Sequence, residues 1–112
     1  MEDRELVKLA AETRKKAYAP YSGFRVGAAL FTGSGRVYTG VNIENASYGA
    51  TVCAERTAVI KAVSEGENKI EAIAIASDSE EIVFPCGICR QVLSEFGDED
   101  MKVICSRQNG EF

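Results

Sequence analysis

A Cys-x-x-Cys pair follows a proline in the stretch Pro85-Cys86-Gly87-Ile88-Cys89-Arg90-Gln91, where an apolar helical pattern begins. Both thiols are therefore expected at the N-terminus of a helix. There the free N–H groups and the helix dipole favour the thiolate, which is the form of cysteine that binds metal. Earlier in the chain, Cys53-Ala54-Glu55-Arg56 contributes a third sulfur and a carboxylate. Together the two stretches predict a metal site built from three cysteines.

Three cysteine ligands would leave a zinc ion one short of its usual four. An open fourth position can hold a water molecule, which distinguishes a catalytic zinc site from a structural one. Glu55 lies close to Cys53 in the sequence, so its carboxylate could move protons to and from that water. We therefore predict one Zn²⁺ ion per chain. Its ligands would be Cys53, Cys86 and Cys89, and Glu55 would be the catalytic acid and base.

Two other interpretations of the cysteines stay open at this stage. Cys86 and Cys89 could form a thioredoxin-like redox pair. That interpretation uses neither Cys53 nor Glu55, and the chain lacks the tryptophan that usually flanks such pairs. Cys105 could be a fourth ligand, which would close the site and make it structural. Its place in an apolar strand pattern favours a small buried core residue instead.

The composition is that of an ordinary globular protein. The 112 residues are 46% hydrophobic and 27% charged, which allows one hydrophobic core and predicts a single domain over residues 1–112. The net charge of −4 argues against a polynucleotide surface, which usually carries a basic excess. The absence of histidine excludes Ser-His-Asp and Cys-His catalysis and any imidazole metal ligand.

The apolar runs and the N-terminal residues bear on cellular location. No apolar run is long enough to span a membrane, and the polar start Met1-Glu2-Asp3-Arg4-Glu5 lacks the features of a secretory signal. We therefore expect a cytoplasmic protein without a membrane partner. In that compartment cysteines serve as metal ligands more often than as disulfides.

Hydrophobic periodicity and turn residues predict three helices and four strands. Helices are expected over residues 3–17, with Asp3 as the N-cap, over 53–64 and over 86–96. Strands are expected over residues 25–31, 36–42, 70–76 and 101–106. A turn at Gln108-Asn109-Gly110 should be followed by a fifth strand that begins at Glu111.

This order of elements predicts an α/β fold. A helix, a hairpin and two helix–strand units would form a mixed sheet with helices on both faces. The two helices that begin with cysteines would then direct their N-termini into one crevice.

Taken together, the motifs resemble those of the small homotetrameric zinc-dependent cytidine deaminases. Along the chain they are Tyr18-Ala19-Pro20-Tyr21-Ser22 with Phe24 and Val26-Gly27-Ala28-Ala29, Asn42-Ile43-Glu44-Asn45-Ala46, Cys53-Ala54-Glu55-Arg56-Thr57 and the stretch from Pro85 to Gln91. Cys-x-Glu followed by Pro-Cys-x-x-Cys is the signature of zinc deaminases. The resemblance implies a three-layer α/β/α cytidine deaminase-like fold, whose usual C-terminal strand and helix would lie beyond Phe112. It also implies a homotetramer with shared active sites.

The resemblance implies roles for four residues that carry little signal of their own. Phe24 would stack on the pyrimidine, and the backbone N–H of Ala54 would bind the base carbonyl. Asn42 and Glu44 would hold the ribose hydroxyls. An amide beside a carboxylate suits a sugar diol, since the amide can donate hydrogen bonds whereas the carboxylate only accepts them.

Four further residues complete the predicted site. By the same resemblance, Ala46 and Tyr48 lie in a segment that reaches the pocket of a neighbouring subunit. Arg56 and Arg90 each follow a cysteine directly or closely in the sequence. Three thiolates around Zn²⁺ leave an excess negative charge, and both guanidinium groups could offset it by hydrogen-bonding the sulfurs. The resemblance supports this role for Arg56.

The implied activity is hydrolytic deamination of cytidine and 2′-deoxycytidine to uridine and 2′-deoxyuridine, a reaction of pyrimidine salvage. Glu55 would take a proton from the water at the zinc site, deliver it to N3 of the base and later protonate the leaving amine. A blasticidin-type aminonucleoside deaminase shares the zinc motifs, but Asn42 and Glu44 favour a nucleoside substrate. A non-catalytic zinc-binding module is the alternative from another class.

Overall fold

The helices and strands alternate along the chain in the order that the sequence predicts. A computed structural model describes all residues from Met1 to Phe112. The helices are α1 (Asp3–Thr13), α2 (Ala54–Ser64) and α3 (Gly87–Phe96), the strands are β1 (Val26–Thr32), β2 (Val37–Val41), β3 (Ile70–Ser77) and β4 (Lys102–Cys105), and the short 3-10 helices are η1 (Arg14–Lys16) and η2 (Tyr48–Ala50). None of the helices is long and apolar enough to cross a membrane. α1 ends earlier than expected, at Thr13, and the residues that follow it form η1.

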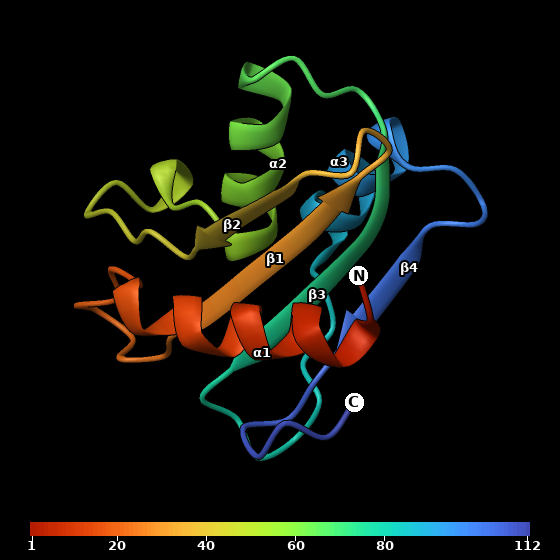
Figure 1. Cartoon of the computed structure of the whole chain (residues 1–112). Coiled ribbons are helices and arrows are strands. Elements are labelled where there is room, and N and C mark those ends of the chain that lie inside the picture. The colour runs from red at the N-terminus through yellow and green to blue at the C-terminus, as the bar shows by residue number, and fades with distance from the viewer.

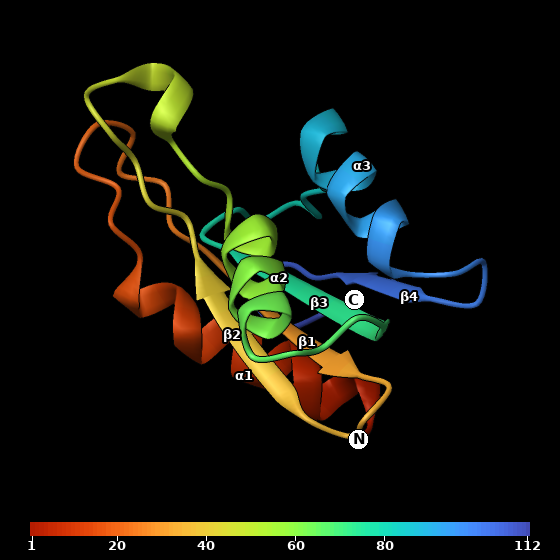
Figure 2. The same ribbon diagram turned by 90° about the horizontal axis from the view of Figure 1, so that it is seen from above.

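The strands form one mixed sheet in the order β2-β1-β3-β4. β1 is antiparallel to β2 and to β3, whereas β3 and β4 are parallel. A parallel pair needs a crossover connection, and α3 provides it between β3 and β4. α1 covers one face of the sheet, while α2 and α3 cover the other (Figures 1 and 2). The predicted three-layer α/β/α fold with a mixed sheet is confirmed.

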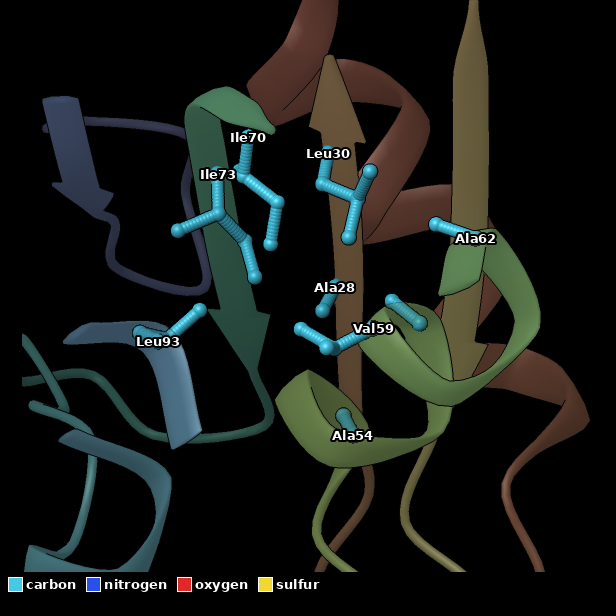
Figure 3. Packing of buried hydrophobic residues seen from close by; sticks show 9 residues of the cluster. Ala28, Leu30, Ala54, Val59, Ala62, Ile70, Ile73 and Leu93 are labelled. Carbon is cyan, nitrogen blue, oxygen red and sulfur yellow. The ribbon is translucent and has the colours of Figure 1, made fainter. Parts of the chain in front are cut away.

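Both faces of the sheet are buried, and successive residues of β1 point into opposite cores. Ala28 and Leu30 lie in one core with residues of α2, β3 and α3 (Figure 3). Ala29, between them, lies in the other core with residues of α1. A strand that is buried on both faces is apolar at nearly every position, which is why β1 and β3 have continuous apolar runs. Because α2 and α3 share one core, both helices begin on the same side of the sheet.

Two details near the chain ends differ from the sequence prediction. The N-cap of α1 is Glu2, with no side-chain capping bond, and Asp3 is the first helical residue. Asp3 instead places its charge in the first turn, where the helix dipole favours a carboxylate, and pairs with Lys102 at 3.2 Å. The predicted Asn-Gly turn forms, but no strand begins at Glu111. The Glu111 carbonyl accepts a hydrogen bond from the Arg107 N–H across that turn, at 2.7 Å.

Two glycines let helices lie directly on the strands. A Cβ at Gly27 of β1 would overlap the backbone of Ala10 in α1 and of Arg14, which directly follows α1. A Cβ at Gly40 of β2 would overlap the backbone of α2 at Ala54 and Ala58. Only glycine permits such a close approach. Gly40 therefore fixes how deeply the first turn of α2 sits on the sheet, which matters because that turn follows Cys53.

Substitution of Gly40 by alanine should destabilise the protein, because the added methyl group must push α2 away from β2. We expect the free energy of unfolding to fall by about 1–3 kcal/mol, the usual cost of overpacking a core, as measured by urea denaturation. Gly33→Ala is the control, since its Cβ would lie 3.6 Å from the flexible side chain of Lys69. Equal destabilisation by the two substitutions would contradict this explanation.

Candidate active site

Three cysteines converge where α2 and α3 begin. Cys53 is the N-cap residue of α2, Cys86 is the N-cap residue of α3, and Cys89 lies in the first turn of α3. The Sγ atoms of Cys53 and Cys86 are 3.9 Å apart, and those of Cys86 and Cys89 are 3.4 Å apart. All three sulfurs lie within 4.8 Å of one another. The two cysteine-containing stretches, distant in the sequence, thus meet at one point.

The spacing of the three sulfurs fits a single zinc ion. A tetrahedral site with Zn–S bonds of about 2.3 Å requires sulfur atoms roughly 3.8 Å apart, which is close to the distances between these thiols. Cys105 does not belong to the group. It is half-buried on β4, opposite Ile75 of β3, and burial raises the pKa of its thiol. The set of three converging sulfurs is that of a zinc site with one position left for water or substrate.

The thiols are electrostatically coupled. A hydrogen bond from Cys89 and a second from the Arg56 guanidinium lower the pKa of Cys53 to about 5. The same contact with Cys53, together with burial, raises the pKa of Cys89. Cys53 is therefore the thiol of the cluster that ionises most readily. Binding of a metal to all three sulfurs would release the remaining protons.

Arg56 lies against this cluster with part of its guanidinium group unsatisfied. Its Nη2 donates to the Thr51 carbonyl at 3.2 Å and to the Cys53 Sγ at 3.7 Å. Its Nε is buried and has no hydrogen-bond partner. A buried N–H without an acceptor is costly. This N–H belongs to a cation beside three thiols, and a cation suits a cluster whose sulfurs become negatively charged when they bind a metal. This chemistry also fits zinc.

Arg90, the other predicted arginine, makes a different contact. Its Nε donates to the Pro85 carbonyl at 3.1 Å, and the structure gives no hydrogen bond from Arg90 to a sulfur. Arg90 therefore ties the first turn of α3 to the residue before Cys86. Its direct role toward the thiolates stays a prediction.

Glu55 is the buried carboxyl group beside the cysteines. Its residue is only 5% exposed, because the first turn of α2 faces the interior of the molecule. Burial raises the pKa of Glu55, and the nearby Cys53 adds to the effect. A general acid and base must accept and then donate a proton, and a raised pKa strengthens the hold of the carboxylate on the proton that it accepts.

A cavity of about 240 Å³ opens beside the cysteines and Glu55. Its lining contains six of the predicted site residues, namely Asn42, Glu44, Cys53, Ala54, Glu55 and Cys86. Its apolar lining includes two residues that the sequence interpretation missed, Val83 and Phe84. The signal that could have identified them is their position directly before the proline of the metal motif. An apolar chamber with a few convergent polar groups is the usual form of a small-molecule site.

The polar end of the cavity is built from the start of β1 and the loop that follows β2. The Asn42 side chain is fixed at both ends: its Oδ1 accepts the Val26 N–H at 2.9 Å, and its Nδ2 donates to the Phe24 carbonyl at 2.9 Å. The Glu44 carboxylate accepts hydrogen bonds from residues Tyr21 and Ser22. Hydrogen bonding to Ser22 is the main cause of the lowered pKa of Glu44, so this carboxylate is ionised at neutral pH.

Three of the residues predicted to bind the substrate lie outside this cavity. Phe24 is 37% exposed in the loop before β1. Ala46 and Tyr48 line a separate cavity of about 360 Å³ that they share with Glu44, and Tyr48 is 91% exposed. Figure 2 shows that the segment between β2 and α2 extends away from the body of the sheet. The stacking role of Phe24 and the intersubunit role of Ala46 and Tyr48 stay predictions.

The fold and the site define a class of protein: a zinc-dependent α/β enzyme of the deaminase type. Residues 1–105 match the family described as the cytidine and deoxycytidylate deaminase zinc-binding region, and the chain therefore belongs to this family. A cytidine deaminase of Halalkalibacterium halodurans is 50% identical over 111 residues, which cover 99% of this chain and 84% of that protein. The family resemblance predicted from the motifs is confirmed.

The solved structures support the same assignment. The crystal structure of cytidine deaminase from Burkholderia pseudomallei has a TM-score of 0.94 and 44% sequence identity, covering 99% of this chain and 89% of that chain. A blasticidin-S deaminase of Bacillus cereus is 35% identical over 106 residues, which cover 88% of this chain and 75% of that protein. The lower identity makes the blasticidin alternative the weaker one.

Removal of one sulfur should abolish metal binding without affecting the fold. We expect Cys89→Ala to reduce the zinc content of the purified protein from about one ion per chain to nearly none, because two sulfurs rarely hold zinc. Cys105→Ala is the matched control and should keep its zinc, since Cys105 lies outside the cluster. Elemental analysis by mass spectrometry measures both. Equal loss of zinc in the two variants would show that the cluster is wrongly assigned.

Proposed function

We propose that this protein catalyses the hydrolytic deamination of cytidine and 2′-deoxycytidine to uridine and 2′-deoxyuridine, with release of ammonia. The observation that carries the proposal is the cavity of about 240 Å³ in which buried Glu55 lies beside two of the three converging cysteines. The names of the relatives, cytidine deaminases at up to 50% identity, support the substrate class.

Zinc would be held by Cys53, Cys86 and Cys89 and would supply a Lewis acid that makes water nucleophilic at neutral pH. Glu55 accepts a proton from the attacking water and delivers it to N3 of the pyrimidine as water adds to C4. Glu55 then passes the second proton of that water to the exocyclic amine, which leaves as ammonia. The raised pKa of Glu55 supports this sequence, because one carboxyl group must act first as a base and then as an acid.

The ends of the nucleoside would be held by the polar lining of the cavity. The backbone N–H of Ala54 lies in the first turn of α2, where N–H groups have no partner within the helix, and it can donate to the base carbonyl. One N–H of the Asn42 amide is free to donate to a ribose hydroxyl, and the Glu44 carboxylate can accept from another. Phe24 would stack on the base, and the apolar residues Val83 and Phe84 would exclude water from it.

Arg56 would offset the negative charge that three thiolates bring to the metal. The Nη2 of Arg56 already donates to the Cys53 sulfur. A hydrogen bond to a metal-bound sulfur reduces the electron density that the sulfur donates to the metal. Arg90 would contribute by holding the Pro85 carbonyl and thereby the start of α3.

Zinc content and cytidine turnover measured on the same purified sample test the proposal. We expect about one zinc ion per chain and a fall in ultraviolet absorbance as cytidine becomes uridine. Glu55→Gln should keep its zinc and its fold but lower kcat by about 10²–10⁴-fold, the usual contribution of a general acid and base. Normal turnover by Glu55→Gln would disprove the proton transfer.

The alternatives give other results in the same assay. Turnover of blasticidin S in preference to cytidine would favour the aminonucleoside enzyme. Zinc without turnover of either compound would identify a non-catalytic zinc-binding module.

The assembly and the setting of the reaction are part of the proposal. Residues 1–112 would act as a single domain in a homotetramer, in which Ala46 and Tyr48 reach the active site of a neighbouring subunit. The 91% exposure of Tyr48 supports this, because the side chain is accessible to a neighbouring subunit. Sedimentation of the purified protein as a monomer would contradict it. The reaction would serve pyrimidine salvage in the cytoplasm.

A further inference from the structure

The hydroxyl group of Ser22 connects two parts of the nucleoside site. Ser22 lies in the exposed loop before β1, and its Oγ accepts a hydrogen bond from the Phe24 N–H at 3.0 Å. The same Oγ donates its only proton to Oε2 of Glu44. A serine hydroxyl has one donor and two acceptor positions, so both bonds can form at once. One atom thus joins the backbone of Phe24 to the carboxylate of Glu44.

Ser22 and its neighbour occupy most of the hydrogen-bonding capacity of Glu44. Oε1 of Glu44 accepts the Tyr21 N–H at 3.0 Å and the Ser22 N–H at 3.1 Å, while Oε2 accepts only the Ser22 hydroxyl. A carboxylate has about four acceptor positions. The position left for a ligand is therefore on Oε2, and the Ser22 hydroxyl determines its direction.

The other side of Phe24 is held by Asn42. The Phe24 carbonyl accepts a hydrogen bond from the Asn42 amide Nδ2, and the Asn42 Oδ1 accepts one from the Val26 N–H. Ser22, Phe24 and Asn42 thus form one connected chain of hydrogen bonds that ends at Glu44. Asn42 and Glu44 line the cavity, whereas Ser22 does not. Ser22 lines the neighbouring cavity of about 360 Å³, which Glu44 also lines. On a ligand in the cavity beside the cysteines, Ser22 can therefore act only through the residues that it holds.

We propose that Ser22 is a positioning residue for the sugar of the nucleoside, whose hydroxyl aligns the Glu44 carboxylate and the Phe24 backbone with a ribose diol. This inference rests on the proposed function. Loss of the hydroxyl would leave Oε2 of Glu44 without its partner, while Oε1 stays bonded to the two backbone N–H groups. It would also leave the Phe24 N–H without its acceptor. Binding of the sugar would weaken, whereas Glu55 and the three cysteines would be unchanged.

The test compares two substrates in the zinc-loaded enzyme, cytidine and 2′,3′-dideoxycytidine, which lacks the 2′ and 3′ hydroxyls of the ribose diol but keeps the 5′ hydroxyl. Ser22→Ala should raise KM for cytidine by roughly 10-fold or more, as expected for loss of a hydrogen bond to a charged group. Its kcat should change by less than about 3-fold. The KM for dideoxycytidine should hardly change, because the diol that Glu44 would hold is absent from it.

Two variants serve as controls. Ser22→Thr keeps the hydroxyl and should restore most of the affinity for cytidine. Ser64→Ala removes an exposed serine hydroxyl at the end of α2 that makes no hydrogen bond with another residue, and it should leave both substrates unaffected. An equal loss of affinity for the two substrates in Ser22→Ala, or no loss at all, would overturn the proposal.

Equilibrium binding of the same two nucleosides, measured by calorimetry, separates this inference from the proposed function. If the unaltered protein binds cytidine without turning it over, the comparison of Ser22→Ala with Ser22→Thr still decides the role of Ser22. If the unaltered protein binds neither nucleoside, the proposed function fails and the role of Ser22 fails with it. If it binds cytidine and Ser22→Ala loses no affinity, only the inference about Ser22 is wrong.

Discussion

The structure depends on the convergence of two helix N-termini on one side of the sheet. α2 and α3 pack into the same core against β1 and β3, and each begins with a cysteine as its N-cap. Helix N-termini favour anions through their free N–H groups and the helix dipole, so this is where thiolates are least costly. The packing of the core thus brings together the three sulfurs that the metal needs.

Burial around this point changes the chemistry of each group. Glu55 would be an ordinary helix carboxylate if it faced solvent, but in the first turn of α2 it is nearly fully buried and its pKa is raised. Arg56, the next residue, lies against the thiols and favours the thiolate form of Cys53. Adjacent positions of one helix therefore place an acid–base group and a compensating cation beside the same cluster.

The polar end of the cavity is organised differently, by loops rather than by the core. Asn42 uses its amide to hold the backbone at Phe24 and Val26, and Glu44 is held by the turn at Tyr21 and Ser22. These loops are exposed, so their geometry depends on hydrogen bonds between side chains and backbone. The metal end of the site is fixed by packing, whereas the sugar end is fixed by polar contacts.

The sequence by itself determined the order of the elements, the mixed sheet and the three sulfurs, because periodicity, turn residues and the spacing of Cys86 and Cys89 are local properties. It did not determine that Phe24 lies outside the cavity, that Phe84 lines it, or that Arg90 bonds the Pro85 carbonyl. These contacts depend on how a loop folds against residues that are distant in the sequence. Only the tertiary structure, through the packing of the helices on the sheet, decides which of these side chains meet.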